Sequence, residues 1–215
     1  MSFETSAYLR KATSRAKSDV ANKLVSMFLH ELSRKNSGAL KLSVTDRPYA
    51  EDVASTFGSK CCYCARPLEE DRASVEHLDG MNRFQVGLHI PGNVIVACKR
   101  CNGEKRRDDQ RHEHILAKSG WESFLSHDST RCEASCKTCA YWRTVWTDQS
   151  DRISALSAAL KRIVDFRSRY PDSLVWSRKA KGLLRKTLDT LYRECQKFAT
   201  EQIEKAVQEI FSEIK

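Results

Sequence analysis

The sequence predicts a mainly α-helical protein with a small α+β centre, and three observations favour this class. Only 8 Gly and 4 Pro occur among 215 residues, so the chain has few of the turns that an all-β fold needs. Both ends repeat apolar residues at helical spacing, whereas short β-like runs, cysteines and histidines gather in the middle. We therefore expect an N-terminal helical segment at 1–44, a central unit at 45–128 and a C-terminal helical region at 129–215.

The first expected element is a helix over 1–37, with a polar end at 34–38. Apolar residues recur along it at three- and four-residue steps. They are Val20, Leu24, Val25, Phe28, Leu29 and Leu32. This periodicity predicts one buried face, which packs either in a core or against a second copy of the chain.

The central unit is expected to contain two short strands and polar helical segments. Residues 73–75 and 94–97 form β-like apolar runs. Residues 102–111 are charged helix formers, and 112–127 predict a second helix that bends near Gly120.

The C-terminal region from about residue 132 is rich in helix formers. Tyr170-Pro171-Asp172 breaks it, with Asp172 or Ser173 as the expected N-cap of the helix that follows. Each part carries its own apolar stripe. We therefore expect two long helices, whose apolar faces serve core packing or a dimer interface.

The charge of the chain favours a polyanionic partner. Lys and Arg number 37 against 28 Asp and Glu, a formal charge of +9. No apolar run approaches the roughly 20 residues of a membrane span, and the N-terminus shows no apolar signal-peptide segment. We expect a cytoplasmic protein without membrane contact, in which the nine cysteines are metal ligands or buried thiols rather than disulfides.

Two Cys-x-x-Cys pairs predict a zinc site. Cys61 and Cys64 form the first pair, and Cys98 and Cys101 form the second. Such pairs each present two sulfurs to one tetrahedral Zn²⁺. Cys62 is left over. The alternative is two unrelated pairs of buried thiols.

The insert between the pairs carries an ordered set of polar residues. A Glu-His pair lies at 76–77, and Gly-Asn at 92–93 precedes the apolar run at 94–97. The second cysteine pair continues as Cys-x-x-Cys-Asn-x-x-Lys over 98–105. Over about residues 60–109 this set resembles the HNH nucleases of the ββα-metal, or His-Me finger, superfamily, and among them the type stabilised by a four-cysteine zinc.

The resemblance implies a role for each matching position. His77 matches the general base, and Asn93 matches the loop Asn that holds the base in orientation. Glu76 and Asn102 match the protein ligands of a catalytic divalent cation. Asp is more usual at position 76, and many members have His at position 102. Oxygen ligands at both positions favour Mg²⁺ or Mn²⁺ over a second Zn²⁺.

The implied chemistry is hydrolysis of a phosphodiester bond. His77 would take a proton from the attacking water, since an unperturbed imidazole titrates near pH 6.5. The cation on Glu76 and Asn102 would stabilise the charge that develops on the phosphate and the leaving oxygen. The zinc would do no chemistry and would hold the two loops together.

A cluster of basic residues surrounds the second cysteine pair and the segment after it. Its members are Lys99, Arg100, Lys105, Arg106, Arg107 and Arg111. We interpret the cluster as a phosphate-binding surface; the alternative is a solvated helix face. Such contacts would position a nucleic acid without reading its sequence.

A third cysteine group, Cys132, Cys136 and Cys139, has two interpretations. It forms a second zinc site, with His127 or His114 as a fourth ligand, or it places three thiols on one side of a helix, where offsets of three and four residues coincide.

These features together predict a metal-dependent HNH endonuclease, with double-stranded DNA as the expected substrate. The helical flanks would supply target choice, a protein partner surface or a homodimer interface. Family analogy suggests a restriction, defence or mobile-element role, and the chain could be the nuclease subunit of a complex. The competing class is a non-catalytic zinc-stabilised module that binds nucleic acid or protein.

Overall fold

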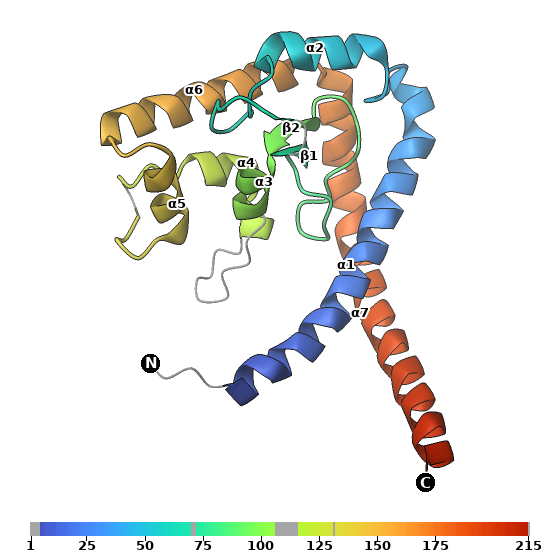
Figure 1. Ribbon diagram of the computed structural model, residues 1–215. Coiled ribbons are helices and arrows are strands. Elements are labelled where there is room, and N and C mark those ends of the chain that lie inside the picture. Colours follow the sequence, from blue (N-terminus) through green and yellow to red (C-terminus); the bar gives the residue numbers. More distant parts are fainter. Residues whose placement is uncertain (1–4, 70–71, 106–115, 131, 215) are drawn as a thin grey trace.

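The computed structural model describes residues 5–69, 72–105, 116–130 and 132–214 (Figure 1). Its elements in chain order are α1 (Thr5–Leu40), α2 (Arg47–Phe57), β1 (Ala73–His77), β2 (Val94–Cys98), α3 (Lys99–Lys105), α4 (Leu116–Leu125), α5 (Lys137–Val145), α6 (Gln149–Ser168) and α7 (Pro171–Ile214). The expected class, mainly α with a small centre that contains strands, is confirmed.

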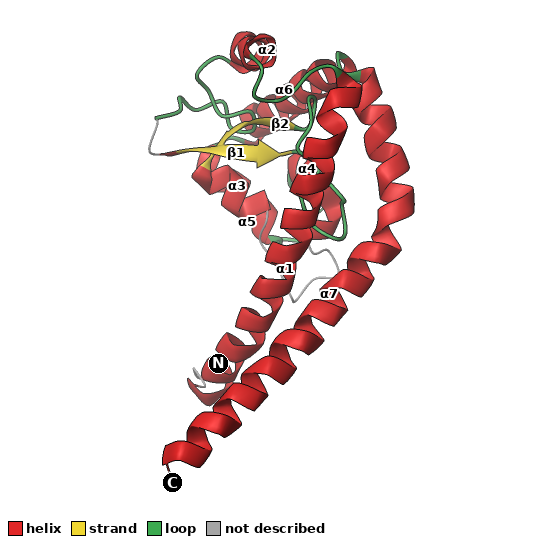
Figure 2. Cartoon of the chain, turned by 90° about the vertical axis from the view of Figure 1, so that its right-hand side faces the viewer, coloured by secondary structure: helices red, strands yellow, loops and turns green. Residues whose placement is uncertain are grey.

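The small sheet at the centre has two antiparallel strands, β1 and β2, and α3 follows β2 directly (Figure 2). Val75 pairs with Val96, and His77 pairs with Val94. Successive side chains of a strand point to opposite faces, so Glu76 and His77 face opposite ways. Glu76 is 1% exposed, whereas its neighbour Val75 is 58% exposed.

The two longest helices, α1 and α7, run antiparallel and cross beside the centre (Figure 1). Gln196 on α7 donates a hydrogen bond to Ser18 on α1 at 3.4 Å. The loop between β1 and β2 packs on this helix pair through a core of Val25, Leu29, Val86, Leu88, Ile90, Ala180 and Leu188. Helices from the N-terminal and C-terminal parts of the chain therefore support the loop that follows His77.

A second, larger core joins the central unit to α5 and α6. Its buried members include Tyr63, Phe124, Trp142, Ile163 and Phe166. The Trp142 indole also donates a hydrogen bond to the Phe124 carbonyl at 2.9 Å. This core crosses the boundary expected near residue 128, because α5 supplies Tyr141 and Trp142 and α6 supplies Leu156, Ala159, Ile163 and Phe166.

The helices differ from the predicted ones in several places. Helix α1 continues to Leu40, past the end expected at 34–38. Helix α2 was not predicted, although Asp46 occupies its N-cap position and Pro48 lies in its first turn. Helix α3 begins at Lys99, three residues earlier than expected. Helix α7 begins at Pro171, before the expected caps. The bend at Gly120 is confirmed, since its φ of 78° interrupts α4.

Asp79, just after β1, ties the centre to the C-terminal helices. Its carboxylate accepts hydrogen bonds from Arg167 on α6 and Lys181 on α7, both at 3.0 Å. Burial raises the pKa of Asp79, but these two cations more than offset that effect, so its pKa lies below the ordinary value.

Replacement of this carboxylate, Asp79→Asn, should lower the free energy of unfolding by about 3 kcal/mol, because it leaves two partly buried cations without their anion. Chemical denaturation at neutral pH measures the loss, and Asp165→Asn on the exposed face of α6 is the matched control. A lowered folded-state pKa adds stability above the unfolded-state pKa. The difference should therefore shrink as the pH falls through the folded-state pKa of Asp79. Equal stability of Asp79→Asn and the wild type would contradict this role.

Among the described residues, no helix combines the length and the apolarity that a membrane span requires.

Candidate metal centre and histidine cluster

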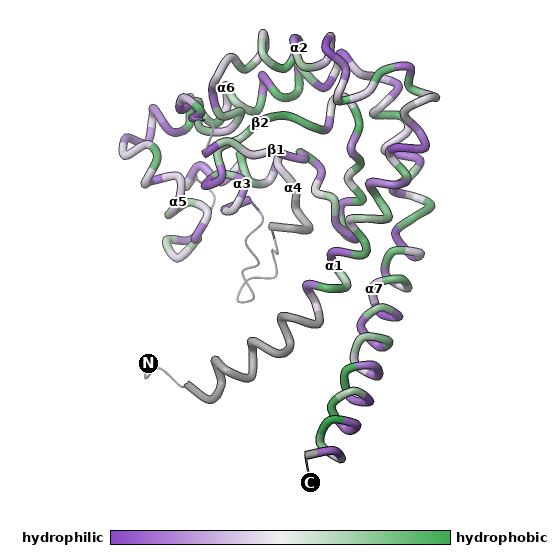
Figure 3. Tube along the Cα trace, turned by 45° about the vertical axis from the view of Figure 1, so that its right-hand side comes forward, coloured by the Kyte–Doolittle hydropathy of each residue, from purple (hydrophilic) through white to green (hydrophobic). Residues whose placement is uncertain are grey.

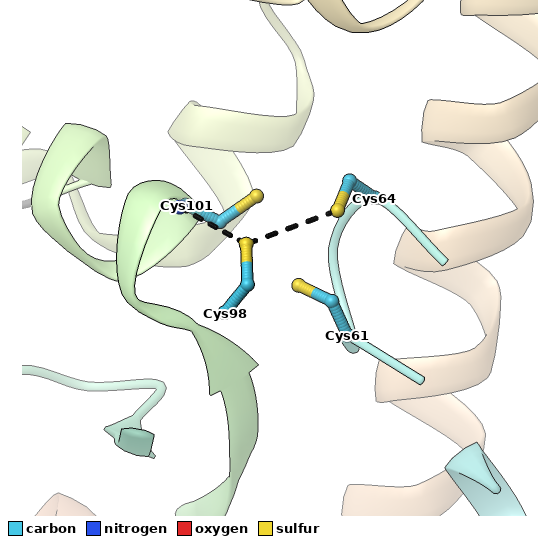
Figure 4. Close-up of side chains that lie close together, drawn as sticks. All are labelled: Cys61, Cys64, Cys98 and Cys101. Atoms are coloured by element: carbon cyan, nitrogen blue, oxygen red, sulfur yellow. Dashed lines mark hydrogen bonds between the residues drawn. The ribbon is translucent and has the colours of Figure 1, made fainter. Parts of the chain in front are cut away.

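Four cysteine sulfurs converge between the α2–β1 loop and the start of α3 (Figure 4). Cys61 and Cys64 lie in the loop between α2 and β1, Cys98 ends β2, and Cys101 lies in the first turn of α3. All four sulfurs lie within 4.8 Å of one another, and those of Cys64 and Cys98 are 4.0 Å apart. Zinc with Zn–S bonds near 2.3 Å would hold tetrahedral sulfurs about 3.8 Å apart. The group could therefore hold a metal such as zinc.

The backbone of the first knuckle is preformed for this arrangement. The Cys61 N–H donates to the Arg66 carbonyl at 2.9 Å, and the Ala65 N–H donates to the Cys61 carbonyl at 2.9 Å. Ala65 adopts a left-handed φ of 54°, which closes the turn. The Cys62 N–H donates to the Val96 carbonyl at 3.2 Å and so ties the knuckle to β2.

The sulfurs interact strongly with one another. Hydrogen bonding to Cys101, the largest cause, lowers the pKa of Cys61 and lowers that of Cys98 to about 6, whereas hydrogen bonding to Cys61 raises the pKa of Cys101. The second knuckle also bonds internally, as the Cys101 N–H donates to the Cys98 sulfur at 3.4 Å. Thiolates and N–H···S bonds are what zinc knuckles use, so the chemistry of the donors fits the metal.

Three histidines from different elements meet at the end of β1. The Nε2 atom of His77 lies 2.9 Å from Nδ1 of His89, in the loop between the strands. His30 on α1 lies with its ring centroid 5.1 Å from that of His89 and 5.9 Å from that of His77. Burial, and then the charge of His30, lower the pKa of His89. Sequence analysis did not identify His30, because no motif links α1 to the insert.

Asn93 fixes the backbone beside His77. Its side chain is buried and donates hydrogen bonds to the carbonyls of Leu88 at 2.8 Å and Asp79 at 3.1 Å. It also accepts from the Asp79 N–H at 2.8 Å. Gly87 allows this closure, since a Cβ there would collide with the Asp79 carbonyl. Asn93 thus holds the end of the loop against its start at Asp79, two residues after His77.

Glu76 is engaged by a buried lysine. The Glu76 carboxylate accepts hydrogen bonds from the Lys105 ammonium and, at 3.0 Å, from the Tyr63 hydroxyl. Lys105 also donates to the His77 carbonyl at 2.5 Å and the Leu78 carbonyl at 2.9 Å. Its side chain is 4% exposed. The expectation that Lys105 binds phosphate is therefore contradicted, because its charge is turned inward and paired.

Asn102 has partners of its own on β1. Its amide nitrogen donates to the Ser74 hydroxyl and the Val75 carbonyl, both at 3.1 Å. A divalent ion on the Glu76 carboxylate would lie against the Lys105 ammonium, which repels it. As arranged, Glu76 and Asn102 do not fit the shared cation site that the family resemblance implies.

The remaining basic residues divide into two sets. Lys99 and Arg100 are exposed at the start of α3, and Arg100 also donates to the Thr144 hydroxyl at 2.7 Å. Arg106, Arg107 and Arg111 lie outside the described residues. Arg100 also lies over the Tyr141 ring, 5.1 Å from its centroid, so it links α3 to α5.

The third cysteine group gathers with His127. Nδ1 of His127 and the sulfurs of Cys132, Cys136 and Cys139 lie within 4.8 Å of one another. The alternative of three thiols on one helix face is contradicted, because Cys132 lies outside α5 and Cys136 is its N-cap. His114 lies outside the described residues. This group, too, could hold a metal such as zinc.

Comparison of the chain with family models, with curated proteins and with solved structures gives no match.

Proposed function

We propose that the chain is an HNH-type endonuclease, a phosphodiester hydrolase of nucleic acid in which His77 is the general base. One observation carries this proposal. An antiparallel hairpin and a following helix meet at a four-cysteine group, and the hairpin presents a half-buried histidine bonded to a second imidazole. The order β1, β2, α3, with Asn93 closing the loop, is what the family resemblance predicts for such a unit.

His77 would take a proton from the attacking water while other groups hold its ring and backbone in place. Nε2 of His77 shares a hydrogen bond with His89, so one of the two nitrogens donates and the other accepts. The lowered pKa of His89 favours its neutral form, which can serve as either partner. Lys105 donates a hydrogen bond to the His77 carbonyl, and Asn93 accepts one from the Asp79 N–H just after His77. These contacts would preorganise the base.

The four cysteines would hold the structural zinc of this unit. When bound, the zinc would link the knuckle before β1 to the start of α3 and so fix the strand that carries His77. Lys99 and Arg100 at the start of α3, together with the net charge of +9, favour nucleic acid as the partner. Double-stranded DNA is the substrate that the family resemblance favours, with a cytoplasmic restriction, defence or mobile-element role.

The apolar far end of α7 is the best candidate for a protein contact. Figure 3 shows hydrophobic residues recurring along it. The exposed members are Phe198, Ile203, Val207, Ile210 and Phe211. A partner protein or a second copy of the chain would bury this face, in line with a nuclease that works within a complex.

A second candidate function is favoured by the Glu76–Lys105 pair. Because this pair occupies the position where the family resemblance implies a metal ligand, a zinc-stabilised module that binds nucleic acid without cutting would have the same structure. The two functions differ in whether the bound strand is cleaved.

The zinc-loaded chain should nick supercoiled plasmid DNA in Mg²⁺ or Mn²⁺ buffer. The test compares supercoiled, linear and single-stranded DNA and RNA, with and without EDTA, and measures binding in parallel by fluorescence anisotropy. Cleavage of any substrate at a rate that scales with protein concentration supports the hydrolase. Binding without cleavage of all four substrates favours the module, and neither binding nor cleavage contradicts both.

A further inference from the structure

We propose that His127, Cys132, Cys136 and Cys139 form a second zinc site, separate from the four-cysteine centre, that locks α5 onto the central unit. The two groups share no residue. This inference does not depend on the proposed nuclease activity.

The distances fit a site with one nitrogen and three sulfurs. Nδ1 of His127 lies 3.3 Å from the sulfur of Cys136 and 3.3 Å from the sulfur of Cys132. Tetrahedral zinc, with Zn–N near 2.05 Å and Zn–S near 2.3 Å, would place nitrogen and sulfur about 3.6 Å apart. A movement of a few tenths of an ångström would therefore admit the ion.

The local structure directs these donors to one point. His127 follows the end of α4, Cys132 lies in the connecting segment, and Cys136 is the N-cap of α5 without a side-chain capping bond. Cys139 lies in the first turn of α5 and is fully buried. Zinc binding would release the thiol protons to solvent.

The segment between α4 and α5 lacks an apolar core of its own. None of the described residues in 126–136 is buried. Its polar bonds are local, such as those of the Thr130 N–H and hydroxyl to the Asp128 carboxylate at 2.9 and 2.6 Å. A segment of this kind gains little from hydrophobic burial, so four convergent ligands supply the order that a core does not.

Helix α5 connects this site to the first centre. Cys139 lies two residues before Tyr141, whose hydroxyl is 3.0 Å from the Cys101 sulfur. On the same helix, the Thr144 hydroxyl accepts the hydrogen bond from the Arg100 guanidinium. Zinc on the second group would therefore hold the start of α5 and keep Tyr141 over the four-cysteine centre.

The test is the zinc content of the purified full-length chain, measured by inductively coupled plasma mass spectrometry. The wild type should hold two zinc ions per chain, and Cys132→Ser and His127→Ala should each hold one. Cys195→Ser, which removes an α7 cysteine outside both groups, should keep two. A wild type with one ion, or a Cys132→Ser variant that keeps two, would overturn the proposal.

Thiol alkylation of the wild type covers the case in which the variants fail to fold. With zinc bound, Cys132, Cys136 and Cys139 should react slowly with N-ethylmaleimide, and chelation should raise their rates together, as mapped by peptide mass spectrometry. Equal rates before and after chelation would refute the second site. Neither measurement uses nucleic acid, so a failure here and a failure of the nuclease proposal are distinguishable.

Discussion

Cys101→Ser is expected to remove zinc from the four-cysteine group and to unfold the central unit. Structural zinc in small knuckle domains contributes roughly 10–16 kcal/mol in apparent binding free energy at neutral pH, comparable to the whole stability of a domain. Cys101 is fully buried and its sulfur contacts the Tyr141 hydroxyl, so serine would also pack poorly in the core. Cys98→Ser should behave alike. Zinc content and thermal unfolding by circular dichroism measure both effects.

Cys62→Ala is the matched control for these variants. Cys62 lies in the same knuckle and is buried, but it is not one of the four grouped sulfurs. It should lose some packing and keep its zinc. A soluble, fully folded Cys98→Ser/Cys101→Ser double mutant that has lost the zinc of the four-cysteine group would refute the structural role of the metal.

His77→Ala is expected to lower the rate of phosphodiester hydrolysis by about 10²–10⁴-fold, the usual contribution of a general base. The half-buried ring contacts His89, and His77 pairs with Val94 at the end of the sheet opposite Cys98. Zinc content and melting temperature should therefore stay close to those of the wild type. The rate is measured as the appearance of nicked circles from supercoiled plasmid.

Val75→Ala is the control on the same strand. Val75 is 58% exposed and pairs with β2 through its backbone alone, so its truncation removes little packing. It should cut at the wild-type rate, which would separate the loss of an imidazole from a general effect of altering β1.

Much of the fold followed from local patterns in the sequence. Helical periodicity predicted α1, α6 and α7, and β-like runs predicted both strands. The spacing of two cysteine pairs predicted the four-sulfur group, because each Cys-x-x-Cys turn brings two sulfurs to one point. Helix α2 was missed although Asp46 and Pro48 marked its start and Tyr49, Val53 and Phe57 repeat at four-residue spacing.

The parts of the site that sequence analysis missed depend on contacts between distant segments. His30 reaches the histidine cluster from α1, and Arg167 and Lys181 reach Asp79 from α6 and α7. Lys105 looked like part of a basic surface, but helix α3 turns it toward Glu76. Charge and spacing along the chain do not reveal which face of a short helix is covered, so these pairings required the structure.

The most direct measurement of the central claim, that a zinc-bound unit presents His77 as a base, is the nicking rate of the wild type beside His77→Ala at equal zinc content. We predict that the wild type converts supercoiled plasmid to nicked circles at least about a hundredfold faster. Equal rates, or a fully zinc-loaded wild type that produces no nicked circles, would contradict the claim.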